Sequence, residues 1–177
     1  MIITGSPGSK PPLQSSQPSN AAIPNQAATV NQRDFDGAEN AFKQVVRLEP
    51  QQEAQYNRAQ VAFGKKDYAR ARDRFEALFS ATPALGDDKS QASQFIKLEI
   101  YLTLLLEGND NSARKMMEQF QFTGDTPALY YAQAAWEFKH NNPAKANDWV
   151  VSAREIYSPA LNLVFADSFY DLGWLAQ

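Results

Sequence analysis

The stretch Gln55–Pro83, QYNRAQVAFGKKDYARARDRFEALFSATP, predicts two short helices that fold back on one another. The turn between them is Lys-Lys-Asp at residues 65–67, a local signal for the end of one helix and the start of the next. In the second helix Ala71 is followed by Phe75 four residues later and by Pro83 twelve residues later. This spacing of a small, a large apolar and a proline residue returns along the chain.

The same spacing occurs at Ala38, Phe42 and Pro50 and at Ala71, Phe75 and Pro83. Two weaker copies follow, at Ala113, Met117 and Pro127 and at Ala146, Val150 and Pro159. Their four alanines are 33, 42 and 33 residues apart. The first helix recurs as well, since an aromatic, a small and an aromatic residue keep identical spacing 75 residues apart, at Tyr56, Ala59 and Phe63 and again at Tyr131, Ala134 and Phe138. A period of this length predicts stacked structural repeats.

A period in the thirties with these landmarks resembles the tetratricopeptide repeat. Residues 131–138 are the closest match to the family's first helix and residues 67–83 to its second, and the resemblance covers residues 33–177. It departs from the family at Ala59 and Gln60, where leucine and glycine are usual. The resemblance implies an all-α superhelix of about eight helices in antiparallel pairs, with the small residues where paired helices cross.

The predicted helices are 35–49, 52–65, 67–81, 89–107, 110–122, 126–140, 143–156 and 159–175. The prolines within this region fall at predicted helix boundaries, and none interrupts a periodic run. Residues 1–32 differ in composition, because they hold five of the ten prolines and one charged side chain, Lys10. Such a segment buries too little apolar surface to offset its ordering entropy. We therefore expect a disordered tail at 1–32 and a helical-repeat domain at 33–177.

Composition excludes several functions. The absence of cysteine excludes disulfides and thiolate metal sites. The sequence has one histidine and its carboxylates are scattered, so no group of residues is a candidate catalytic centre. We therefore expect no enzymatic activity, cofactor or metal. The net charge of −3 argues against nucleic-acid binding. The most apolar run, 95–106, is shorter than the roughly 20 residues of a membrane-spanning helix, so we expect a soluble protein. Its compartment stays open, with periplasm or cell envelope favoured over cytoplasm.

In proteins that this chain resembles, the first helix of each pair lines a concave groove. The side chains opposite the expected packing faces are the groove candidates: Asn57, Val61, Lys65, Ala132, Trp136, Lys139 and His140. Trp136 is the strongest candidate, because tryptophan is enriched among residues that dominate binding energy, and a place in the core is its alternative. Asn57 follows Tyr56 as in chaperone-binding members of the family, where an asparagine helps to hold a terminal carboxylate.

These observations predict a protein–protein interaction module or scaffold that binds a peptide or partner segment in its groove. The alternative is a structural subunit of a larger envelope or secretion assembly, held through the aromatic last helix by Phe169 and Trp174. Burial of that helix against the preceding repeat is the plainer reading of its apolar side chains. An RNA-binding helical repeat is the third hypothesis, disfavoured by the net negative charge of the chain. The sequence leaves self-association open.

Overall fold

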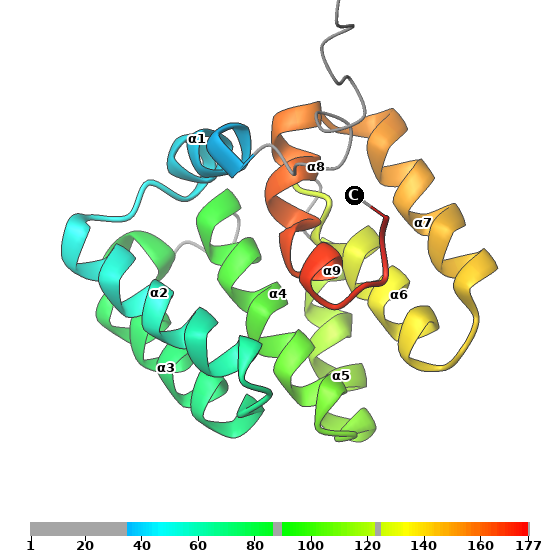
Figure 1. Ribbon diagram of the computed structural model, residues 1–177, viewed down its shortest axis with the longest axis horizontal. Coiled ribbons are helices and arrows are strands. Elements are labelled where there is room, and N and C mark those ends of the chain that lie inside the picture. The colour runs from blue at the N-terminus through cyan, green and yellow to red at the C-terminus, as the bar shows by residue number, and fades with distance from the viewer. Residues whose placement is uncertain (1–34, 87–89, 123–124, 177) are drawn as a thin grey trace, which may run out of the picture. The chain divides into compact units, whose positions relative to one another are not determined.

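The regular structure of the chain is helical throughout the described part of the computed structural model, residues 35–86, 90–122 and 125–176 (Figure 1). Its α-helices are α1 Phe35–Val46, α2 Pro50–Gly64, α3 Tyr68–Ala81, α4 Gln91–Leu106, α5 Asp110–Met117, α6 Ala128–Lys139, α7 Pro143–Ile156, α8 Pro159–Phe165 and α9 Asp167–Asp171. Two short 3₁₀ helices join them, η2 Pro83–Gly86 and η3 Glu118–Phe122. The predicted all-α class is confirmed, and the predicted tail at 1–32 lies outside the described residues.

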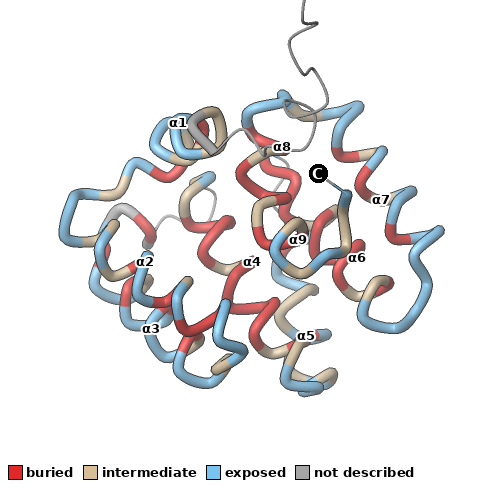
Figure 2. Tube along the Cα trace, viewed as in Figure 1, coloured by how far each residue is buried: buried red, intermediate tan, exposed pale blue. Residues whose placement is uncertain are grey.

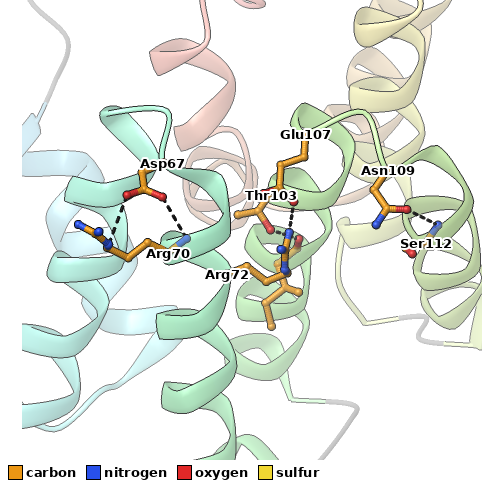
Figure 3. A network of polar contacts seen from close by, with 8 residues as sticks. Asp67, Arg70, Arg72, Thr103, Glu107, Asn109 and Ser112 are labelled. Carbon is orange, nitrogen blue, oxygen red and sulfur yellow. Dashed lines mark hydrogen bonds and ion pairs between the residues drawn. The ribbon is translucent and has the colours of Figure 1, made fainter.

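Side chains just before several helices explain where those helices begin. Asp67, Ser90, Asn109 and Ser158 each accept a hydrogen bond from the backbone N–H three residues later. Such a cap satisfies a donor that has no partner within the helix. Figure 3 shows two of these caps beside the ion pair of Arg72 on α3 with Glu107 at the end of α4. The predicted boundaries at Pro143 and Pro159 are confirmed, because each proline occupies the first turn of its helix.

Three helix hairpins, α2–α3, α4–α5 and α6–α7, share one turn geometry. Each turn has a residue with positive φ, Lys66 at 61°, Gly108 at 82° and Asn141 at 60°. In each, the next residue donates its backbone N–H to the carbonyl five positions earlier, a hydrogen bond that closes a helix end. These turns are 42 and 33 residues apart, as are the alanines of the last three sequence copies. The sequence repeat is therefore also a backbone repeat.

The small residues of the repeat lie inside these hairpins. Ala71, Ala113 and Ala146 are fully buried, as expected for side chains at a close helix crossing. Ala38 is only half-buried, because α1 packs against α4 and α8 rather than forming such a hairpin. The first and eighth helices are therefore neighbours in space.

Helix α4 is the centre of the core. It packs against α1, α3, α5, α6 and α8, and Figure 2 shows buried residues along most of its length. A helix covered on nearly every side is hydrophobic around its whole circumference, which explains the apolar run at residues 95–106. No described helix is long and apolar enough to cross a membrane.

The predicted last helix, 159–175, is wrong in its continuity. The chain bends at Ala166 between α8 and α9, and α9 ends at Asp171. Gly173, with φ of 70°, then reverses the chain so that the N–H of Trp174 donates to the carbonyl of Phe169. These bends place Phe169 and Trp174 against Phe138 of α6.

Candidate functional site

The C-terminal helices α8 and α9 cover one face of α4 and α6, which we call the inner face. Phe165 of α8 lies 5.6 Å from Phe95 and 6.4 Å from Tyr131, measured between ring centroids. Phe169 of α9 lies 5.3 Å from Tyr131 and 6.3 Å from Phe138. Most of these ring pairs meet edge to face, the arrangement that aromatic quadrupoles favour. The chain thus occupies its own inner face with aromatic side chains.

Buried hydrogen bonds fix α8 in this position. The hydroxyl of Tyr131 donates to the backbone carbonyl and the side-chain oxygen of Asn162, at 3.2 and 3.1 Å. The side-chain amide of Asn162 in turn donates to the carbonyls of Ala153, Tyr157 and Ser158. Burial raises the pKa of Tyr131, so its hydroxyl remains a neutral donor. Helix α8 is therefore held to both helices of the preceding hairpin.

A buried carboxyl group, that of Glu99 on α4, lies between α2 and α9. It is 1% exposed, and its two oxygens accept hydrogen bonds from Gln60 of α2 at 3.2 Å and from Ser168 of α9 at 2.8 Å. Burial raises the pKa of Glu99 to about 7, although both hydrogen bonds lower it. Glu99 therefore changes its charge near neutral pH.

An open pocket of about 560 Å³ lies between α1 and α2 on one side and α8 and α9 on the other. Its apolar lining residues are Ala38, Phe42, Tyr56, Leu163 and Val164, and its polar ones are Glu39, Glu53, Asn57, Asp167 and Asp171. Four carboxylates lie around this apolar surface and one of them, Glu39, pairs with Lys43, so the acidic pocket keeps an excess of negative charge. Its volume is within the roughly 300–1,000 Å³ of typical ligand pockets.

The predicted groove residues on α2 are exposed. Asn57 lines the acidic pocket, whereas Val61 is 55% exposed and Lys65 lies at the helix end. The exposure of these three residues matches the prediction that they face away from the hairpin. Asn57 is the one of the three that the structure brings to a concave site.

The predicted groove residues on α6 do not join that site. Ala132 is fully buried, and the hydroxyl of Tyr101 donates to its carbonyl at 2.9 Å, so its assignment to an open groove is wrong. Trp136 stacks on His140 with ring centroids 4.2 Å apart, and the guanidinium of Arg114 from α5 lies 4.9 Å from the indole.

The ring of His140 also lies 3.1 Å from a carboxylate oxygen of Asp110 at the start of α5. Lys139 is exposed beside it. This face of α6 therefore turns toward the preceding hairpin, and Tyr131 and Phe138, which were assigned to hairpin packing, face α8 and α9 instead. Because α6 is covered on both sides, its sequence does not distinguish the side that faces α5 from the side that faces α8 and α9.

The aromatic C-terminal residues are used internally. Phe169 is fully buried, which contradicts its predicted availability to another chain. Trp174 stacks on Phe138 with centroids 5.5 Å apart and planes 13° from parallel, and it remains half-buried. Of the two interpretations of the last helix, burial against the preceding repeat and contact with another chain, burial is confirmed for Phe169.

Sequence reasoning missed the partnership of Glu99 with Gln60 and Ser168. The one available signal was an acid inside the most apolar run of the chain, where a buried charge requires an explanation. Among the described residues, no cluster of histidine and acidic side chains is suited to holding a metal ion. Comparison with protein-family models, with characterised proteins and with solved structures gives no match for the chain.

Proposed function

We propose that this chain is a non-catalytic protein-interaction module, a tetratricopeptide-like superhelix that binds a partner polypeptide at the acidic pocket. Three hairpins with the same turn geometry and repeat spacing support the superhelix. The observation that carries the function is the acidic pocket itself, because it is open, has an apolar surface and contains Asn57 of the predicted groove.

The lining of the pocket favours a segment that carries lysine or arginine. Such side chains lay their aliphatic stems on apolar surface while their charged ends reach acceptors. Here Phe42 and Leu163 offer the apolar surface, and Glu53 offers a carboxylate beside them. Binding of this kind weakens as salt screens the charges.

A peptide titration tests this function. The probe is a fluorescein-labelled nonapeptide of alternating lysine and leucine, and its control has glutamate in place of lysine. Fluorescence anisotropy is expected to show salt-sensitive binding of the lysine peptide alone. Glu53→Gln is expected to weaken it by about two- to fivefold, the effect of roughly one exposed ion pair. Glu76→Gln removes the same charge from the exposed surface of α3 and is expected to leave binding unchanged.

Equal binding of both peptides, or equal losses for the two variants, would exclude the acidic pocket as the binding site. The alternative role, attachment to an assembly through the aromatic C-terminal residues, now requires α9 to leave its place, since Phe169 is fully buried.

A further inference from the structure

Helix α9 is docked over a carboxyl group whose hydrogen-bond donors are neutral. Ser168 donates to one oxygen of Glu99 and Gln60 to the other. Neither donor compensates a negative charge as lysine or arginine would. Because an uncompensated carboxylate is costly to hold away from water, ionisation of Glu99 opposes the docking of α9.

The charged groups around Glu99 add to this effect. Asp171 of α9 raises the pKa of Glu99 further, and the hydroxyl of Tyr56 on α2, whose own pKa is raised by burial and then by Glu99, stays neutral. Helix α8 carries no charged residue, and Asp167 of α9 lines the acidic pocket. Several charged side chains on α4 and the helices around it have partners of their own: Lys43 with Glu39, Arg72 with Glu107, His140 with Asp110, Lys145 with Glu137, and Lys97 over the ring of Phe79.

We propose that α9 is a proton-controlled cover of the inner face, docked while Glu99 carries a proton and released when Glu99 gives that proton to solvent. Release uncovers Tyr131 and Phe138 and withdraws Asp171 from the wall of the acidic pocket. This inference concerns the C-terminal segment alone and does not depend on the proposed peptide ligand.

Helix α9 is the element that moves. It is held by Phe169, by the bond of Ser168 to Glu99 and by a 3.4 Å hydrogen bond that the hydroxyl of Tyr170 accepts from Arg154 of α7. Its five residues are too few to form a stable helix without tertiary contacts. The bend at Ala166 and the reversal at Gly173 separate it from its neighbours along the chain. Helix α8 stays, since Asn162 anchors it through buried hydrogen bonds.

The direction of the pH effect follows from proton linkage. Burial raises the pKa of Glu99 to about 7 in the docked state, while a solvated glutamate has its ordinary value of 4.5. Between these values the docked state binds more protons than the released state. Docking of α9 is therefore strongest below pH 4.5, and it weakens progressively as the pH rises to about 7.

Hydrogen–deuterium exchange of residues 166–176 in the full chain, measured from about pH 5 to about pH 8.5, tests the proposal. After correction for the intrinsic pH dependence of amide exchange, the opening equilibrium is expected to rise by up to about tenfold per pH unit until about pH 7 and then level off. Protection that does not change with pH would refute a proton-controlled cover. In a variant that carries Trp136→Phe and Trp149→Phe, the fluorescence of Trp174, which stacks on Phe138, is expected to change over the same range.

Matched variants assign the transition to Glu99. Glu99→Gln is expected to keep α9 protected at all these pH values, and the same transition in this variant would overturn the proposal. Two further variants decide the question should Glu99→Gln not fold. Ser168→Ala removes a hydrogen bond that lowers the pKa of Glu99 and is expected to move the midpoint up. Asp171→Asn removes a charge that raises this pKa and is expected to move the midpoint down. Midpoints that do not move in these opposite directions would also overturn it.

Discussion

The hydroxyl of Tyr101 on α4 donates a 2.9 Å hydrogen bond to the backbone carbonyl of Ala132 on α6. Tyr101 is a large residue at the repeat position that Ala59 and Ala134 occupy in the other two hairpins, and this bond satisfies its hydroxyl in the core. One repeat along, Tyr131 of α6 makes the same kind of connection to Asn162 of α8. Buried tyrosines thus connect the first helices of successive hairpins and the helix that follows them.

Tyr101→Phe is expected to lower the free energy of unfolding by about 1–2 kcal/mol, because the carbonyl of Ala132 loses its buried donor while the ring packing is retained. Urea denaturation measures the change. Tyr68→Phe is the matched control, since the Tyr68 ring packs on Phe63 and its burial is only partial. Equal losses in both variants would show that the bond to Ala132 contributes nothing specific.

Enlarging the alanines at the hairpin crossings is expected to be destabilising. Ala71→Leu and Ala146→Leu each place a larger side chain at a fully buried position, at a cost of about 1–3 kcal/mol. Ala69→Leu and Ala144→Leu make the same change at exposed positions of the same helices and serve as controls. Melting temperatures from circular dichroism separate the pairs, and equal melting of buried and exposed variants would refute close packing at these positions.

His140 is the only histidine in the sequence, so its ring can be titrated without overlap from another histidine. The hydrogen bond with the carbonyl of Trp136 raises the pKa of His140, and Asp110 raises it further. The stabilising contribution of the protonated ring is present below its unfolded pKa of 6.5 and is lost as pH rises through the higher folded value. Asp110→Asn is expected to lower the pKa of His140 in an NMR titration of its ring, whereas Asp148→Asn, at an exposed position of α7, should leave it unchanged. A value unaffected by Asp110→Asn would mean that this ion pair does not persist in solution.

Local patterns predicted the hairpins because the determinants are local. The buried Ala71 and Ala146, the caps at Asp67 and Ser158 and the proline at the start of α7 all act within a few residues of sequence. The class of the fold and most of its boundaries follow from such signals.

The candidate site was only partly predictable, because it depends on distant contacts. Ser168 meets Glu99 across 69 residues, and no spacing in the sequence encodes that meeting. Helix α6 is apolar on two sides, so its sequence alone does not tell that Tyr131 faces α9 while Trp136 faces α5. The sequence around the bend at Ala166 contains no glycine or proline, the residues that would have predicted a break in the helix.

The packing of α1 against α8 has a consequence for biosynthesis. A ribosome makes α8 and α9 after α4 and α6, so the aromatic rings of the inner face emerge before the helices that cover them. Until then the nascent chain exposes Phe95, Tyr131 and Phe138. The inner face of the nascent chain therefore stays uncovered until α8 packs against α1 and α4, which is the interval in which exposed apolar surface favours aggregation.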